Sequence, residues 1–376
     1  SCDKEAKDME ILVMGAGLVG ETIALELGKA HSLLVIDSNP DRIKDLDGHQ
    51  GIRGLVLSVT DKDGVRDLIH KVDLVVGALP GFLGYEALKM VLEEGKPAVD
   101  ISFFPEDPFS LAKLAEEKHT FAIVDAGVAP GLSNLVAGFE HSKNPLASFT
   151  CYVGGLPKER KWPFQYKAPF SPLDVLEEYT RPARIRRQGR IITRPALSEQ
   201  EILHFPKIGS LEAFLTDGLR TLLQTLDIPN MEEKTLRYPG HAALIQALNE
   251  AGFLDSKNLE SGISPRKFTS QILKNCWKLD EQEEEFTIMK VLLEREQERI
   301  EYFLYDERDK ETGYSSMSRT TGFTCIACVE LVLEGKIQKT GILPLEILGQ
   351  EGELALAIFQ KLESKGISFQ VQRKIK

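Results

Sequence analysis

At residues 11–20 the chain reads Ile11-Leu12-Val13-Met14-Gly15-Ala16-Gly17-Leu18-Val19-Gly20, an apolar run that leads into the pattern G-x-G-x-x-G. The apolar run predicts a buried β-strand, and residues 18–30 predict a helix that begins inside the glycine pattern. Gly15 permits the tight turn, Gly17 lets backbone amides approach a pyrophosphate, and Gly20 allows close packing of the helix on the strand. The positive end of the helix favours the phosphates. This segment therefore predicts a dinucleotide-binding turn.

The next apolar run ends in an acidic residue at the position that such a turn requires. Residues 33–36 predict a second strand, and Asp37 follows it, about 20 residues after the first glycine. A carboxylate there hydrogen-bonds the ribose hydroxyls of a dinucleotide and repels a 2′-phosphate, so NAD is the expected cofactor. Arg42 carries the charge that a 2′-phosphate needs, which keeps NADP open as the alternative.

Outward from this motif, residues 9–128 alternate apolar runs with helical patterns, which indicates βαβ units and a parallel sheet. Further strands are expected at 55–57, 73–79, 98–100 and 121–124, and further helices at 61–70, 84–94 and 108–118. The fold class is α/β, with an N-terminal Rossmann domain built on a doubly wound parallel sheet.

Ligands of such sheets lie beyond the carboxyl ends of the strands, so residues at those ends are candidates for the site. The expected cofactor-binding residues are Gly15, Ala16, Gly17, Leu18, Val19, Gly20, Asp37, Ser38, Ala78, Leu79, Pro80, Asp100 and Ser102. Asp125 ends the last predicted strand and is the expected catalytic carboxylate that meets a substrate amine. Helix capping is the alternative role for Asp125.

After the Rossmann domain the pattern changes, and residues 129–318 predict a second, mixed α+β domain for substrate binding and dimerisation. Two hairpins are expected, at 184–193 and at 286–305, with a third strand near 314–318. Residues 319–376 predict C-terminal helices that return to the Rossmann domain.

Charge and composition exclude several classes of partner. The formal net charge is −11, which disfavours nucleic acid and anionic membranes, because both attract basic surfaces. The polar start at 1–8 and the lack of a long apolar segment predict a cytoplasmic protein without a signal peptide. Cys325 and Cys328 form a lone C-x-x-C and are expected to be core residues, so no metal site is predicted.

Several longer motifs resemble lysine 6-dehydrogenase and its saccharopine dehydrogenase-like relatives. These motifs are Asp125-Ala126-Gly127-Val128-Ala129-Pro130-Gly131, Tyr152-Val153-Gly154-Gly155-Leu156-Pro157, Leu211-Glu212-Ala213-Phe214, Thr235-Leu236-Arg237-Tyr238-Pro239-Gly240-His241 and Ser318-Arg319-Thr320-Thr321. They occur in the family's order from Met9 to about residue 340. The resemblance implies NAD-dependent oxidative deamination of the side-chain amine of L-lysine by a homodimer.

An amino-acid substrate brings a carboxylate, which calls for a cationic or hydrogen-bonding partner in the substrate domain. The expected substrate-binding residues are Tyr166, Lys167, Arg237, His241 and Arg319. Two other functions stay open. One is a saccharopine reductase or dehydrogenase, which acts on a secondary amine and needs at least two carboxylate clamps. The other is a non-catalytic NAD sensor.

Overall fold

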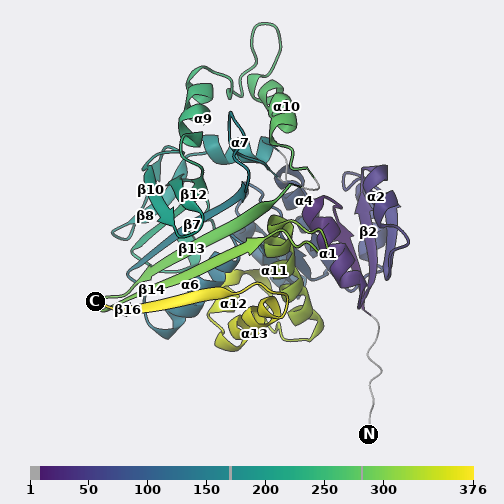
Figure 1. Cartoon of the computed structure of the whole chain (residues 1–376). Coiled ribbons are helices and arrows are strands. Elements are labelled where there is room, and N and C mark those ends of the chain that lie inside the picture. The colour runs from purple at the N-terminus through teal and green to yellow at the C-terminus, as the bar shows by residue number, and fades with distance from the viewer. Residues whose placement is uncertain (1–8, 169–171, 281–282) are drawn as a thin grey trace. The chain divides into compact units, whose positions relative to one another are not determined.

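The computed structural model describes residues 9–168, 172–280 and 283–376, and the chain divides into two compact units (Figure 1). The first unit comprises the chain up to Leu135 together with Ser318–Lys365, and the second comprises Val136–Met317 together with Gly366–Lys376. The polar residues 1–8 lie outside the described part of the chain. The division of the chain falls within two helices, α6 (Leu132–Lys143) and α11 (Ser316–Leu333).

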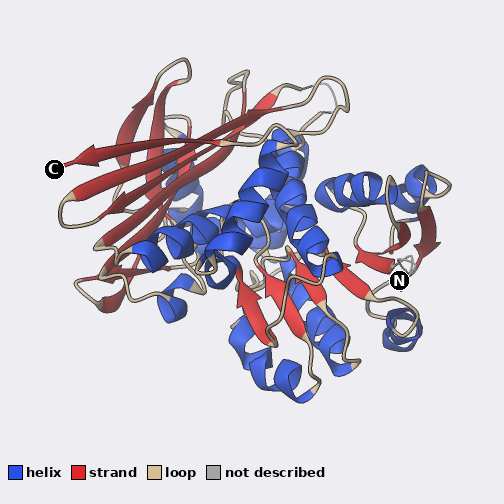
Figure 2. Ribbon diagram, turned by 90° about the horizontal axis from the view of Figure 1, so that it is seen from below, coloured by secondary structure: helices blue, strands red, loops and turns tan. Residues whose placement is uncertain are grey.

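The first unit contains a seven-stranded parallel sheet in the order β15-β6-β5-β4-β1-β2-β3, with helices against its faces (Figure 2). The strands are β1 (Glu10–Met14), β2 (Ser32–Asp37), β3 (Ile52–Val56), β4 (Leu74–Gly77), β5 (Ala98–Asp100), β6 (Phe121–Val124) and β15 (Gly341–Pro344). The helices are α1 (Leu18–Gly28), α2 (Pro40–Leu46), α3 (Lys62–Ile69), α4 (Gly81–Glu93), α5 (Ala112–Glu117), α12 (Leu345–Gly349) and α13 (Gly352–Glu363), with a 3-10 turn at Pro108–Leu111. The predicted doubly wound fold is confirmed.

The strand order reverses between β1 and β4, and this switch point is where such sheets bind ligands. Almost every side chain of β1 and β4 is buried, as expected for parallel strands that are covered on both faces. The sequence prediction differs from the structure at several places in this unit. Strand β3 begins at Ile52 rather than at 55, and α2, α12 and the seventh strand β15 were not predicted.

The second unit contains a mixed nine-stranded sheet with the path β10-β11-β12-β7-β13-β14-β16, beside which β8 pairs with β12 and β9. The strands are β7 (Ser148–Pro157), β8 (Ala183–Arg187), β9 (Arg190–Arg194), β10 (Glu201–Phe205), β11 (Gly209–Leu215), β12 (Asn230–Arg237), β13 (Glu285–Glu294), β14 (Glu298–Glu307) and β16 (Phe369–Ile375). The helices are α7 (Pro172–Thr180), α8 (Leu222–Thr225), α9 (His241–Glu250) and α10 (Pro265–Trp277). Both predicted hairpins are present, as β8–β9 and β13–β14.

The core of the second unit joins three helices to the sheet. Tyr179 of α7, Ile245 of α9 and Trp277 of α10 belong to one buried cluster with Leu236 of β12 and Ile288 of β13. This packing places aromatic side chains from distant parts of the sequence next to one another.

The strand predicted near 314–318 is absent, because helix α11 begins at Ser316. The buried carboxylate of Glu285 accepts hydrogen bonds from the backbone N–H of Ser316 and, at 2.5 Å, from its hydroxyl. A carboxylate that satisfies the first donors of a helix stabilises the helix beginning. The third strand beside the β13–β14 hairpin is instead β16, near the end of the chain, which pairs with β14.

No helix among the described residues is long and apolar enough to cross a membrane. They also contain no group of three or more histidine, cysteine or acidic side chains arranged to hold a metal ion.

Candidate functional site

The glycine pattern forms a turn at the switch point that leaves no room for a side chain at Gly15 or Gly20. Gly15 has φ +101°, and a Cβ placed there would lie 2.3 Å from the carbonyl oxygen of Ala78. A Cβ on Gly20 would lie 2.1 Å from the carbonyl oxygen of Gly15. The turn is tied to β2 by a hydrogen bond of 2.8 Å from the N–H of Gly15 to the carbonyl of Ile36. These are the constraints of a dinucleotide-binding turn.

Asp37 is fixed at the end of β2 against this turn. One carboxylate oxygen accepts the N–H of Ala16 at 2.8 Å, and the other accepts the N–H of Asn39 at 2.8 Å. The carboxylate is therefore locked in one orientation beside the glycine pattern, in the region where the adenosine ribose of a dinucleotide lies in this fold.

A second polar group links the loops after β4 and β5. The buried Asp100 accepts the N–H of Ser102 at 2.8 Å, and the Ser102 hydroxyl accepts the N–H of Leu79 at 3.3 Å. Two glycines make room for these side chains. A Cβ on Gly77 would lie 1.8 Å from an Asp100 oxygen, and one on Gly84 would lie 2.4 Å from the Ser102 Cβ. Asp100 thus acts through Ser102 to hold the loop that contains Leu79.

The other predicted cofactor residues follow the ends of the strands in the same unit. Ala16 is buried, Leu18 is exposed, Val19, Ala78 and Leu79 are half-buried, and Ser38 and Pro80 lie in the exits of β2 and β4. Phe82 and Phe103, which the sequence reasoning missed, follow β4 and β5 and are also exposed. Apolar side chains at these strand exits suit the flat rings of a nucleotide.

Asp125 and Arg319 also lie in the first unit. Asp125 follows β6, is buried, and has φ 53°. Non-glycine residues rarely adopt this left-handed conformation, and they occur at functional sites when the surrounding structure enforces it. Arg319 lies on α11, donates a hydrogen bond of 3.2 Å to the carbonyl of Lys365, and has its guanidinium 5.4 Å from the ring centroid of Phe323.

In the second unit the structure brings together three of the predicted substrate residues, Tyr166, Arg237 and His241. The Arg237 guanidinium lies 4.3 Å from the ring centroid of Tyr166, and the rings of Tyr166 and His241 are 5.3 Å apart. Tyr179 connects Arg237 with His241, because its oxygen lies 2.8 Å from Arg237 Nε and 2.8 Å from His241 Nε2. Tyr179 was not predicted, since nothing in its local sequence on α7 distinguishes it from a core residue.

The hydrogen bonds of this cluster have one consistent direction. His241 Nδ1 lies 2.9 Å from the carbonyl oxygen of Phe164, which can only accept, so Nδ1 carries the proton. The unprotonated Nε2 then accepts the hydroxyl proton of Tyr179, whose oxygen accepts the Nε–H of Arg237. Burial and the charge of Arg237 lower the pKa of His241 to about 3, so this ring is neutral at pH 7.

Arg237 is a buried cation without an ion-pair partner among the described residues. Its guanidinium donates hydrogen bonds to the Tyr179 hydroxyl and, at 2.9 Å, to the carbonyl of Leu236. Burial alone lowers the pKa of Arg237, but Tyr179, Tyr166 and Glu178 raise it above its ordinary value, and the group stays charged. Buried charges in proteins are normally paired. The guanidinium can therefore accept an anionic group as a further partner.

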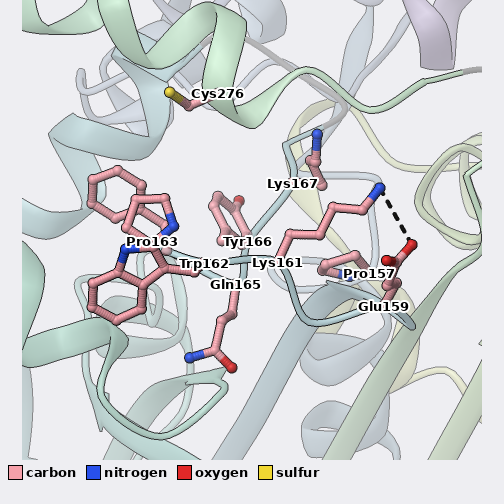
Figure 3. A pocket seen from close by; sticks show the side chains of 10 residues that line it. Pro157, Glu159, Lys161, Trp162, Pro163, Gln165, Tyr166, Lys167 and Cys276 are labelled. Atoms are coloured by element: carbon pink, nitrogen blue, oxygen red, sulfur yellow. Dashed lines mark ion pairs between the residues drawn. The ribbon is translucent and has the colours of Figure 1, made fainter.

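The rings of Phe164 and Tyr166 also line a cavity of about 210 Å³ (Figure 3). Trp162, 80% exposed, and Cys276 of α10 also line it. Its other lining residues are Pro157, Glu159, Lys161, Pro163, Gln165 and Lys167.

The two lysines of this cavity are already paired with acids. Lys161 lies 3.3 Å from Glu159 and 3.5 Å from Glu283, and Lys167 lies 3.5 Å from Glu283. The Lys167 ammonium also donates a hydrogen bond of 2.9 Å to the carbonyl of Lys278. The cavity therefore has charges of both signs. Of the predicted substrate residues, Tyr166 and Lys167 line the cavity. Arg237 and His241 do not line it, but both contact the Tyr166 ring.

The low pKa of His241 predicts a pH dependence of stability. A histidine that is neutral in the folded state stabilises the fold above its unfolded pKa near 6.5, and this contribution falls as the pH drops toward the folded value of about 3. The free energy of unfolding should decrease by about 1.4 kcal/mol per pH unit in this range from His241 alone. His241→Gln should show a shallower slope in denaturant titrations between pH 6.5 and pH 4. His204→Gln, at an exposed position of β10, is the matched control, and identical slopes for wild type and His241→Gln would contradict a neutral His241.

The fold and the turn define the class of this protein. A glycine pattern at the switch point of a parallel sheet, with an acidic residue fixed at the end of the second strand, is a pyridine-nucleotide-binding domain. The geometry of Gly15, Gly20 and Asp37 fits such a nucleotide.

Comparison with known proteins identifies the family. Residues 11–123 match the saccharopine dehydrogenase NADP binding domain, and residues 127–367 match the saccharopine dehydrogenase C-terminal domain. The chain belongs to the saccharopine dehydrogenase family, which confirms the resemblance seen in its motifs. It is similar to an alpha-aminoadipic semialdehyde synthase of Arabidopsis thaliana, with 24% identity over 233 residues, 58% of this chain and 22% of the synthase. The chain therefore spans about a fifth of that relative.

Two saccharopine dehydrogenases are similar over more of their length. The L-glutamate-forming, NADP(+) saccharopine dehydrogenase of Schizosaccharomyces pombe is 23% identical over 287 residues, 70% of this chain and 64% of that enzyme. The apo structure of the L-Glu-forming saccharopine dehydrogenase from Saccharomyces cerevisiae superimposes with a TM-score of 0.80 at 18% identity, covering 97% of this chain and 100% of that one. The likeness to that structure shows a common fold.

Proposed function

We propose that this protein oxidises the side-chain amine of L-lysine with NAD, as a lysine 6-dehydrogenase does. The observation that carries the proposal is the contrast between Arg237 and the lysines of the cavity. Arg237 is buried without an ion-pair partner among the described residues, whereas Lys161 and Lys167 each lie within 4 Å of a glutamate. One buried cation without an ion-pair partner among the described residues can bind one carboxylate, which is the number that lysine carries. Glu159, which lines the cavity, suits a substrate that also carries an ammonium group.

The proposed chemistry removes one hydride and one proton from the amine end of the substrate. When bound, NAD supplies the hydride acceptor for the carbon that bears the amine. Hydride leaves that carbon only from the neutral amine, so a base first takes a proton from the ammonium group. We assign this base to Asp125, the buried carboxylate after β6. Water then adds to the carbon of the resulting imine and ammonia leaves, which gives an aldehyde, or the α-amine adds to that carbon and displaces ammonia as the ring closes.

Asp37 supports NAD as the cofactor. Both of its oxygens accept backbone N–H groups, so the carboxylate cannot easily turn away from the turn. A fixed negative charge there attracts the 2′-hydroxyl of the adenosine ribose and repels a 2′-phosphate. The proposal differs in this respect from the S. pombe relative, whose name states NADP(+).

The second candidate function is cleavage or formation of saccharopine, and the names of the similar enzymes favour it. Saccharopine has more than one carboxylate, so this function requires further cations in the site besides Arg237. Either function uses the same turn and the same buried arginine.

A substrate panel distinguishes these functions. The purified protein is mixed with NAD or NADP and with L-lysine, saccharopine or cadaverine, and formation of the reduced nucleotide is followed by absorbance. We expect the highest kcat/KM with L-lysine and NAD, together with release of ammonia. Turnover of saccharopine with no turnover of lysine would replace the leading proposal by the second. Binding of NADH with no turnover of any amine would leave a nucleotide sensor.

A further inference from the structure

Next to Asp37 stands an exposed arginine that the proposed function does not use. Arg42 lies in the first turn of α2, and its Nη1 is 3.5 Å from the Asp37 oxygen that accepts the N–H of Ala16. The same Nη1 would lie 3.8 Å from a Cβ on Gly17, the glycine that lets backbone approach the pyrophosphate. The guanidinium is therefore beside both the ribose acid and the glycine pattern.

The surroundings of Arg42 leave its charged end able to move. Its side chain is 53% exposed, whereas that of Asp37 is 10% exposed and held by two backbone amides. An exposed ion pair of this kind contributes little to stability, so exchanging it for another anion costs little. A guanidinium binds phosphate oxygens with two parallel N–H donors, which makes it suited to a 2′-phosphate.

We propose that Arg42 determines how strongly this protein discriminates between NAD and NADP. This inference rests on the proposed role of Asp37 as the ribose acid. Asp37 and Arg42 act as an opposed pair at one position: the carboxylate favours the ribose hydroxyl, and the guanidinium offsets that charge and binds a 2′-phosphate when one is present. The protein accordingly accepts NADP as its weaker nucleotide, and Arg42 is the reason that it accepts NADP at all.

The proposal predicts a specific pattern of nucleotide affinities. Arg42→Gln should weaken NADPH binding by at least about tenfold, the effect of losing a charge-assisted hydrogen bond, and change NADH binding by less than about threefold. Asp37→Asn should strengthen NADPH binding and weaken NADH binding. In the double variant Asp37→Asn/Arg42→Gln the gain in NADPH binding should disappear, because no cation remains to pair with the phosphate.

The affinities are measured by fluorescence titration with NADH and NADPH, without any amine substrate. Lys44→Gln removes a positive charge from an exposed position of the same helix and is the matched control. If Arg42→Gln binds both nucleotides as wild type does, or if the double variant binds NADPH as tightly as Asp37→Asn, the proposal is wrong. Failure of wild type to bind either nucleotide would instead overturn the proposed function, so the two failures are distinct.

Discussion

Alanine at position 20 is expected to abolish dinucleotide binding. The added Cβ would lie 2.1 Å from the carbonyl oxygen of Gly15 and 3.0 Å from its carbonyl carbon. Both atoms belong to the backbone of the turn, so the turn itself must move, and the helix must separate from β1. Displacing binding groups by about 1 Å costs about two orders of magnitude in a preorganised site, so NADH should bind at least about 100-fold more weakly.

The control for Gly20→Ala is a second glycine in the same unit. A Cβ on Gly322 of α11 would lie 3.5 to 3.8 Å from side chains of α1, which is ordinary van der Waals contact. Gly322→Ala should therefore leave NADH binding unchanged and stabilise the helix slightly, because alanine has the higher helix propensity. The measurements are NADH fluorescence titration and thermal unfolding. NADH affinity of Gly20→Ala within a few-fold of wild type would mean that the turn does not hold the dinucleotide.

The nucleotide turn was predictable from the sequence because all its constraints are local. Gly15, Gly20 and the strand before them lie within ten residues, and Asp37 follows at the spacing that one βαβ unit imposes. The seventh strand β15 was not predictable in the same way. It has four residues, and its partner β6 lies more than 200 residues earlier in the chain. A short apolar run is compatible with several structures, and only the partner selects one.

The sequence was sufficient to predict that Arg237 of β12 and His241 of α9 belong to the substrate cluster. It was not sufficient to predict that Tyr179 connects them. Arg237 and His241 are neighbours in sequence, and their proximity follows from the turn between β12 and α9. Tyr179 reaches them from α7, 58 residues before Arg237. The neutral state of His241 depends on that same tertiary packing, because burial and the charge of Arg237 cause it. The charge state of His241 was therefore harder to predict from the sequence than its position.

Arg237→Met is expected to remove most of the activity on lysine while the protein stays folded. Replacing a buried charge by an apolar side chain of similar volume is often neutral for stability, and the Tyr179 hydroxyl keeps its bond to His241. The substrate carboxylate, in contrast, loses its charged partner. A charge-assisted hydrogen bond contributes about 1.5–3 kcal/mol, so kcat/KM for lysine should fall by about 10- to 150-fold, and further if the pair is bidentate.

The matched control is Arg186, another buried arginine of the same unit, whose hydrogen bonds go to carbonyl groups. Arg186 donates hydrogen bonds to the carbonyls of Leu226 at 2.8 Å and Leu223 at 2.5 Å, beneath the β8–β9 hairpin. Arg186→Met should destabilise the protein, because it leaves these carbonyls without their donor, and should leave kcat/KM at the permissive temperature unchanged. Arg237→Met should show the opposite pattern, so stability and activity together separate a clamp from a structural arginine.

Cadaverine tests whether the effect of Arg237→Met acts on the carboxylate. This diamine has the reacting end of lysine and lacks the carboxylate, so wild type should oxidise it poorly, and the substitution should change that rate little. The ratio of kcat/KM for lysine to that for cadaverine should therefore collapse in Arg237→Met, while NADH affinity stays constant. An equal loss for both substrates would show instead that Arg237 supports the shape of the site through Tyr179 and Tyr166. Unchanged lysine kinetics in a folded variant would assign the carboxylate to another cation, with Arg319 and Lys167 as the next candidates.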